Sequence, residues 1–242
     1  MRPPPCVSMT SPFPGSALIW GMASSATPVT AQPRLLVVGA GAIANSLLPR
    51  VARMGWSLIT IMDGDRVEEK NLERQELFAP VDIGKPKCEV LAAWLRNMPM
   101  PVHVSFVDEF LDGSNAGRIL ALHDVVADCT DDAHAKRLLD RKCAEYGLAL
   151  VSGSVHGAQA QVIALHAEGP GEEIARDDLF SGKLGGEQDG CDMRHVPLAT
   201  INETGRRMAQ LLQALASREP VTNGRIDLFD GHQWTAIDPP TT

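Results

Sequence analysis

The sequence predicts an α/β fold of the Rossmann-like, doubly wound type, with a mainly parallel sheet that is extended by antiparallel C-terminal strands. Three observations support this prediction. Short apolar runs alternate with helically spaced segments between residues 35 and 151. A glycine-rich turn, Gly39-Ala40-Gly41, stands between the first apolar run and the first helical segment. From residue 158 the pattern changes, and two short strand-like runs near the C-terminus suit a hairpin.

The predicted strands are short apolar runs bounded by polar residues or glycine. They cover residues 35–38, 58–62, 102–107, 124–129, 149–151, 159–166, 225–229 and 233–237. The predicted helices cover residues 42–54, 86–98, 116–122, 133–146 and 201–215. Pro49 is expected to kink or loosen the first helix, because proline has no backbone N–H to donate. Residues 64–83 and 168–191 are predicted to be loops, and loops of that length are usually functional or disordered.

The glycine turn and the acid that follows the second strand favour a nucleotide-binding βαβ unit. Gly39 permits a tight turn, and Gly41 lets a phosphate approach the backbone N–H groups of a helix N-terminus. Asp63 lies about 20 residues past the glycines, the spacing expected of an acid that hydrogen-bonds ribose. The alternative is a glycine turn that serves packing alone.

Composition limits the class of protein. The chain has 242 residues, 44% of them hydrophobic, and a formal net charge of −8, which suits one α/β domain with a substantial core. The acidic balance argues against nucleic-acid binding and against an anionic membrane surface. Five cysteines without a C-x-x-C pair indicate a reducing, cytoplasmic environment and neither a disulfide framework nor a zinc site. No apolar run approaches the roughly 20 residues that span a bilayer.

The first 33 residues differ in composition from the rest, since they are rich in Pro, Ser, Ala and Thr. We expect a flexible tail over residues 1–33 and a single domain over residues 34–242. A secretory signal or a gene start placed too far upstream are the alternatives, and Met22 is a possible initiator.

Polar residues follow two of the predicted strands, at the edge where open α/β sheets bind ligands. Guanidinium and ammonium groups suit a polyphosphate, and a carboxylate such as Asp131 suits Mg²⁺. The residues therefore predict a site for a nucleoside triphosphate. They are Asp63 and Asp65 after the second strand, Asp131 and Asp132 after the fourth, Asn71, Arg74 and Gln75 in the long loop, and Lys85 and Lys87 at the next helix.

Four motifs in order resemble those of the ubiquitin-activating-like adenylyltransferases, which include the activators of sulfur-carrier proteins in thiamine and molybdopterin synthesis. Residues 63–75 (DGDRVEEKNLERQ) resemble the signature D-x-D-x-V-x-x-x-N-L-x-R-Q. Residues 84–87 (GKPK) are similar to G-x-P-K, residues 128–132 (DCTDD) to D-x-T-D-N, and residues 151–154 (VSGS) to the strand that follows. The resemblance extends from about residue 34 to residue 237.

The resemblance implies an ATP- and Mg²⁺-dependent reaction. The C-terminal carboxylate of a small ubiquitin-like protein, ending in Gly-Gly, attacks the α-phosphate of ATP, and pyrophosphate leaves. The resemblance also implies a homodimer. By position, it assigns the nucleotide phosphates to Gly39 and Gly41, the ribose to Asp63, the phosphates to Asn71, Arg74 and Gln75, the α-phosphate to Lys87, and Mg²⁺ to Asp131.

Some positions depart from the family's pattern. The paired C-x-x-C motifs that bind zinc in many relatives are absent, as is the N-terminal arginine segment that reaches the partner's nucleotide. Asp132 stands for the usual Asn, and Lys136 for the usual Arg. Cys191 lies near the cysteine with which some relatives capture the activated carrier, and a covalent role for it stays open because no adjacent general base is evident.

The sequence leaves three other functions open. One is the dehydration of threonylcarbamoyl-adenosine in tRNA within the same family, which the acidic charge disfavours. The others belong to different classes, a dinucleotide-dependent oxidoreductase and a non-catalytic module that binds nucleotide or carrier. Comparing the melting temperature with ATP–Mg²⁺ and with NAD(H) separates an adenylyltransferase from an oxidoreductase. Pyrophosphate release with candidate carriers separates an enzyme from a non-catalytic module.

Overall fold

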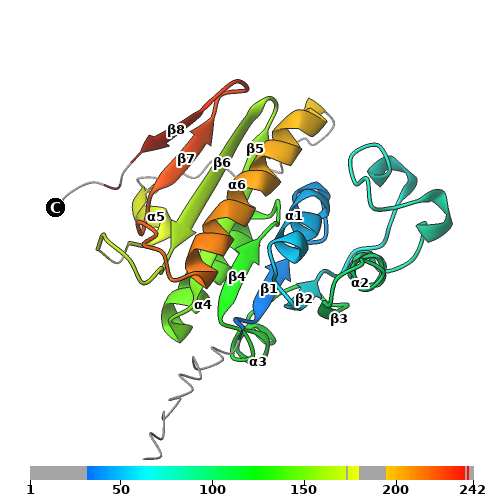
Figure 1. The fold of residues 1–242 in the computed structure, drawn as a ribbon, viewed down its shortest axis with the longest axis horizontal. Coiled ribbons are helices and arrows are strands. Elements are labelled where there is room, and N and C mark those ends of the chain that lie inside the picture. Colours follow the sequence, from blue (N-terminus) through cyan, green and yellow to red (C-terminus); the bar gives the residue numbers. More distant parts are fainter. Residues whose placement is uncertain (1–31, 173, 180–194, 238, 240–242) are drawn as a thin grey trace, which may run out of the picture. The chain divides into compact units, whose positions relative to one another are not determined.

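One sheet of eight strands, in the order β3-β2-β1-β4-β5-β6-β7-β8, forms the centre of the fold (Figure 1). The computed structural model describes residues 32–172, 174–179, 195–237 and 239, so most of the predicted tail and Cys191 fall outside the described residues. The strands are β1 Leu35–Val38, β2 Leu58–Met62, β3 His103–Val107, β4 Val125–Asp128, β5 Ala149–His156, β6 Gln159–Leu165, β7 Ile226–Phe229 and β8 Trp234–Ile237.

Helices cover both faces of the sheet, as the layers in Figure 1 show. The larger apolar cluster lies under α1, α2 and α6, and the smaller one lies on the opposite face under α3 and α4. The α-helices are α1 Ala42–Arg53, α2 Lys87–Arg96, α3 Ala116–Leu120, α4 Ala133–Tyr146, α5 Arg176–Leu179 and α6 Leu198–Ala216.

The predicted fold class is confirmed. Strands β3, β2, β1, β4 and β5 run parallel, and β5 to β8 pair antiparallel. The parallel strands are connected by helices, which explains the alternation in the sequence. β1 is buried on both faces of the sheet, which explains why its sequence is an unbroken apolar run.

Several element boundaries differ from the prediction. β5 continues to His156, because residues beyond Ser152 extend past the end of β4 and pair with β6 instead. The four-residue helix α5 lies inside a predicted loop, since one turn is too short to show helical periodicity. Helix α1 runs through Pro49 to Arg53, close to the predicted bounds of residues 42–54, and a kink at the proline stays a prediction.

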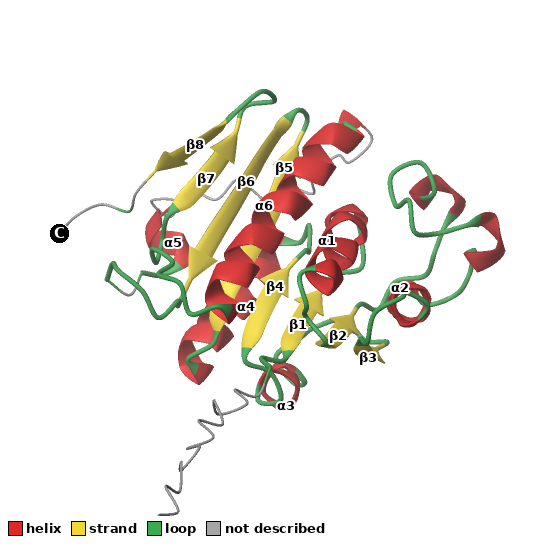
Figure 2. Cartoon of the chain, viewed as in Figure 1, coloured by secondary structure: helices red, strands yellow, loops and turns green. Residues whose placement is uncertain are grey.

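The segment between β2 and α2 is a long loop, as predicted, and it contains two single-turn 3₁₀ helices (Figure 2). These are η1, Glu69–Asn71, and η2, Pro80–Asp82. At its base the loop closes on itself through a bridge between Arg66 and Pro86. The loop therefore leaves the sheet and returns to the same edge, next to the ends of β1 and β2.

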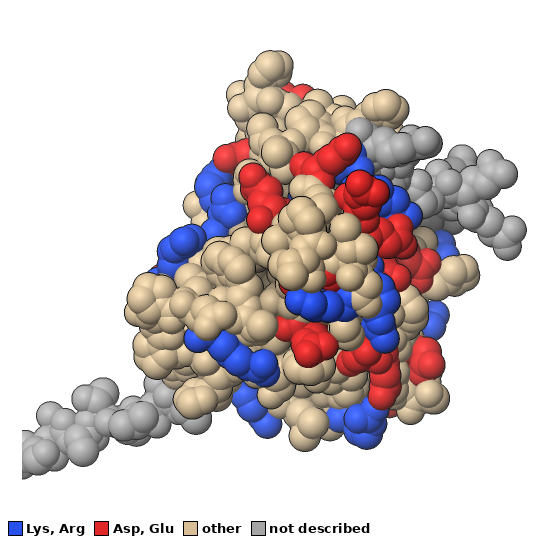
Figure 3. Space-filling model, turned by 90° about the vertical axis from the view of Figure 1, so that its right-hand side faces the viewer, with Lys and Arg blue, Asp and Glu red and all other residues tan. Residues whose placement is uncertain are grey.

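Charged side chains of both signs intermingle on the face seen in Figure 3. That face has no broad basic area of the kind that binds a nucleic-acid backbone. Among the described helices, none is long and apolar enough to cross a bilayer.

Candidate functional site

A cleft of about 1010 Å³ lies at the carboxyl ends of β1, β2 and β4. Its wall includes residues of the glycine turn, the loop between β2 and α2, the start of α2, and the start of α4. The eight described residues to which the family resemblance assigns nucleotide or metal binding all line it: Gly39, Gly41, Asp63, Asn71, Arg74, Gln75, Lys87 and Asp131. Cys191, the ninth candidate, falls outside the described residues.

Asp63 holds the glycine turn through its carboxylate. Oδ2 accepts a hydrogen bond from the Ala40 N–H at 2.5 Å, and Oδ1 accepts one from the Asp65 N–H at 2.7 Å. Burial raises the pKa of Asp63, although these two hydrogen bonds oppose the shift. A carboxylate has about four acceptor sites, so the Asp63 oxygens retain capacity for the hydroxyl groups of a ribose.

The two glycines of the turn have different surroundings. Gly39 has a φ of +92°, and a Cβ added there would lie 2.8 Å from the carbonyl carbon and oxygen of Cys129. Gly41 has a φ of −82°, and nothing lies within 4 Å of a Cβ added there. The first glycine is therefore required by backbone packing between β1 and β4, whereas the second leaves space in the cleft at the start of α1.

These surroundings predict that alanine substitutions at the two glycines affect different properties, stability at Gly39 and ATP binding at Gly41. Gly39→Ala is expected to lower the free energy of unfolding by about 2 kcal/mol or more, through backbone strain and steric clash. Gly41→Ala is expected to leave stability within about 0.5 kcal/mol of wild type and to weaken ATP binding, because its methyl group would occupy the cleft. Urea unfolding and calorimetric titration with ATP measure the two effects. A stable Gly39→Ala protein would contradict the close approach to Cys129.

Cationic and amide groups line the side of the cleft formed by the long loop and α2. Lys87 is buried, and its Nζ contacts Asp65 Oδ2 at 2.8 Å. No hydrogen bond or ion pair of the Arg74 side chain is found among the described residues. Gln75 Oε1 is buried and has no hydrogen-bond partner among them. The guanidinium and the amide are thus available to a ligand.

Asp65 and Lys85, which the sequence also placed in the predicted site, differ in their contacts. An Asp65 carboxylate bonded to its own turn is not found, because Asp63 accepts the turn's N–H group and Asp65 pairs with Lys87. Lys85 does not line the cleft, and its half-exposed side chain contacts Asp82 Oδ1 at 2.9 Å.

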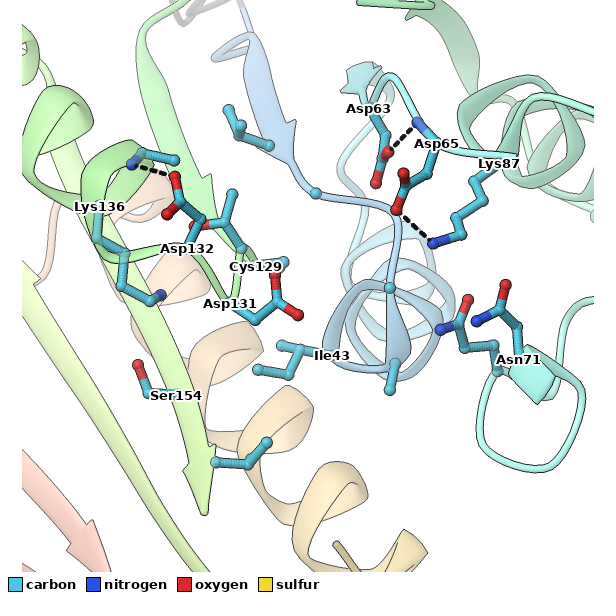
Figure 4. A pocket seen from close by; sticks show the side chains of 18 of the residues that line it. Ile43, Asp63, Asp65, Asn71, Lys87, Cys129, Asp131, Asp132, Lys136 and Ser154 are labelled. Atoms are coloured by element: carbon cyan, nitrogen blue, oxygen red, sulfur yellow. Dashed lines mark hydrogen bonds and ion pairs between the residues drawn. The ribbon is translucent and has the colours of Figure 1, made fainter. Parts of the chain in front are cut away.

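Asp131 and Asp132 on the opposite side of the cleft have different environments (Figure 4). Asp132 is the N-cap of α4, and its carboxylate accepts hydrogen bonds from His134 N–H and Ala135 N–H. Asp131 is exposed in the cleft, and its carboxylate has no hydrogen-bond partner among the described residues. Asp132, which stands where the family usually has Asn, therefore caps α4. The Asp131 carboxylate is available to a ligand.

A buried polar cluster under this side of the cleft was not identified from the sequence. The fully buried Asp128 accepts hydrogen bonds from Ser152 Oγ at 2.6 Å, from Thr130 Oγ1 at 2.7 Å and from Lys136 Nζ at 3.0 Å. Lys136 also donates to the Gly153 carbonyl at 2.9 Å. A charged residue ending an apolar strand is a possible sequence signal, but its partners come from elements far apart in the chain.

The end of β5 extends the cleft away from the glycine turn. Ser154, Val155 and the exposed His156 line this part. His156 is thus a residue of the cleft that the sequence analysis did not single out.

The chemistry of the donor groups fits Mg²⁺ at Asp131. Mg²⁺ in nucleotide sites is usually held by one or two carboxylates together with phosphates and water. Among the described residues, no group of three or more His, Cys, Asp or Glu side chains could hold a metal by itself. The absence of zinc stays a prediction.

Comparisons with known proteins agree with the motifs. Residues 26–238 match the model of the ThiF family. The molybdopterin-synthase adenylyltransferase of Escherichia coli is 30% identical over 198 residues, which cover 81% of this chain and 78% of that protein. The SAMP-activating enzyme E1 of Haloferax volcanii is 34% identical over 137 residues, which cover 57% of this chain and 51% of that protein.

The fold also matches solved structures. The crystal structure of E. coli MccB with ATP has a TM-score of 0.67 and 18% sequence identity, over 85% of this chain and 64% of MccB. This chain therefore spans about half of the length of the SAMP-activating enzyme and less than two thirds of MccB.

Proposed function

This chain belongs to the ThiF family, and from that membership and the cleft we propose that it is an adenylyltransferase. Its proposed substrates are ATP and the C-terminal carboxylate of a small ubiquitin-like or sulfur-carrier protein ending in Gly-Gly. The products are an acyl-adenylate and pyrophosphate.

The observation that carries this proposal is the arrangement of the cleft. Asp63, the N-terminus of α1 and Lys87 lie on one side of the cleft, and Asp131 lies opposite them (Figure 4). Arg74 also lines the cleft. A dinucleotide site has no evident use for the two cations together with a facing carboxylate, whereas a triphosphate with Mg²⁺ uses all three.

In the proposed reaction, a carboxylate oxygen of the carrier forms a bond to the α-phosphorus, and the bond from that phosphorus to the pyrophosphate oxygen breaks. Lys87 stabilises the negative charge that develops around the α-phosphate. Asn71, Arg74 and Gln75 bind the phosphates that leave as pyrophosphate. The protein contributes mainly positioning and charge stabilisation, because the chemistry requires no covalent participation from it.

Asp131 is the residue that would hold Mg²⁺, which, when bound, neutralises phosphate charge. Burial of Lys87 beside Asp65 keeps the ammonium at the cleft before nucleotide arrives. A phosphate oxygen then competes with Asp65 for the same donor.

The direct test is ATP–pyrophosphate exchange with the full-length protein, Mg²⁺ and candidate carriers that end in Gly-Gly. Exchange is expected with an intact carrier and not with the same carrier lacking its last glycine. ATP with Mg²⁺ at 100 times its Kd should raise the Tm by about 5 °C or more, since such saturation adds about 2.7 kcal/mol. Stabilisation by NAD(H) alone, with no exchange for any carrier, would overturn the proposal in favour of an oxidoreductase.

Covalent capture of the carrier by Cys191 and homodimerisation stay predictions. Mass spectrometry for a carrier adduct that is lost in Cys191→Ser tests the first. Light scattering of the purified protein tests the second.

A further inference from the structure

Hydrogen bonds attach the loop between β2 and α2 at its base and at one place farther along, and the attachment at the base includes the pairing of Arg66 with Asp108. At its base, backbone hydrogen bonds join residues 65–67 to residues 84–87. Farther along, the Leu77 N–H donates to Asn45 Oδ1 at 3.0 Å. In the part of the chain that the structure describes, the other hydrogen bonds of residues 68–82 stay within the loop and its base. The Asn45 side chain is therefore the hydrogen-bonded tether of the loop's outer part.

The same Asn45 side chain holds the glycine turn. Its Nδ2 donates to the Gly41 carbonyl at 2.9 Å and lies 3.4 Å from the Ala40 carbonyl oxygen. The side chain is 5% exposed, so water does not replace these contacts easily. A carbonyl can only accept and a backbone N–H can only donate, so the partners determine the orientation of the amide.

The tether lies next to the turn that carries the candidate phosphate ligands. The backbone N–H groups of Arg74 and Gln75 both donate to the Asn71 carbonyl, and the Phe78 N–H donates to the Gln75 carbonyl. This compact turn leads directly to Leu77. The Asn45 side chain thus connects two segments of backbone. One is the glycine turn, which offers N–H groups at the start of α1. The other is the turn that carries the Arg74 guanidinium and the side-chain amides of Asn71 and Gln75.

We propose that Asn45 is a positioning residue that sets the separation between the glycine turn and the turn bearing Arg74 and Gln75, so that both contact one triphosphate. The inference rests on the proposed function for the identity of the ligand. Phe78 is buried in the larger apolar cluster, so the loop stays packed without this tether. The turn bearing Arg74 and Gln75 would then lose its hydrogen-bonded connection to α1, and nucleotide binding must fix its position, a conformational cost that opposes binding.

The test compares Asn45→Ala with Ser46→Ala in the full-length protein. Ser46 is the adjacent buried residue on α1, and its Oγ contacts Asn202 of α6 instead of the loop. Asn45→Ala is expected to raise the KM for ATP by about tenfold, the effect of about 1.4 kcal/mol, with a smaller change in kcat. Hydrogen exchange of residues 68–79 in the nucleotide-free protein should accelerate. Ser46→Ala should change neither quantity.

A purely structural role of Asn45 predicts a different result, in which less folded enzyme lowers the apparent kcat and leaves the KM for ATP unchanged. Unchanged loop exchange, or faster exchange with a wild-type KM and Kd for ATP, would overturn the proposal. Asn45→Asp provides a second variant, because it keeps an acceptor for Leu77 but has no donor for Gly41. We expect near-wild-type loop exchange in Asn45→Asp together with weaker ATP binding.

The proposed function and this inference fail in different ways. If the wild-type protein bound no ATP, the proposed function and the nucleotide-positioning role of Asn45 would both fail. This would hold even if hydrogen exchange showed that Asn45 restrains the loop. If the wild type catalysed exchange and Asn45→Ala matched its KM and its loop exchange, this inference alone would fail.

Discussion

Lys87→Ala is expected to reduce ATP–pyrophosphate exchange by about 100- to 1,000-fold, the scale seen when one preorganised charge-stabilising donor is removed. The lysine lies in the cleft with its ammonium on Asp65, and no other cation of α2 lines the cleft. Stability should change little, because the Asp65 side chain left behind is 54% exposed and remains hydrated. Exchange assays and thermal unfolding of the same preparation measure both quantities.

Lys85→Ala is the matched control for this prediction. It removes a lysine two residues away that pairs with Asp82 outside the cleft. We expect wild-type exchange activity from Lys85→Ala. An active, well-folded Lys87→Ala protein would refute the assignment of Lys87 to the α-phosphate.

Asp128→Ala is expected to cause the largest loss of stability, about 3–5 kcal/mol, because it leaves a buried Lys136 ammonium without its counter-charge. For a chain of this length the Tm should fall by about 10 °C. Asp124→Ala provides the control, since that carboxylate pairs with Arg34 at an exposed position where an ion pair contributes about 1 kcal/mol or less. Equal losses for the two variants would contradict the role of the buried cluster.

The same cluster predicts the direction of a pH dependence. Burial by itself would raise the pKa of Asp128, but the Lys136 charge and the hydrogen bonds from Ser152 and Thr130 outweigh it and hold the pKa below its ordinary value of 3.8. A carboxylate with a lowered folded-state pKa stabilises the protein above the unfolded-state pKa, and this contribution is lost as the pH falls through the folded-state value. We expect the stability difference between wild type and Asp128→Ala to shrink below about pH 4.

The apolar and polar pattern of neighbouring residues predicted the sheet well, because the periods of strands and helices depend on residues close together in the sequence. The first two strands were predicted with the bounds that the structure has, since glycine follows one and an acid follows the other. The N-cap role of Asp132 could also have been predicted, because Asp directly before a helical run is a common cap. The extension of β5 could not, because its last residues depend on pairing with β6 and not on their own pattern.

The candidate nucleotide residues were identified from spacing and motif order, because chain direction in a parallel sheet brings the ends of β1, β2 and β4 to one edge. Which of those groups are already engaged and which remain available was decided by tertiary structure. Asp132 is engaged at the helix and Asp131 faces the cleft, while Asp128 lies in a buried cluster with Lys136 and Ser152. Side-chain partners of this kind come from segments that the sequence separates, and only the folded backbone brings them within hydrogen-bond distance.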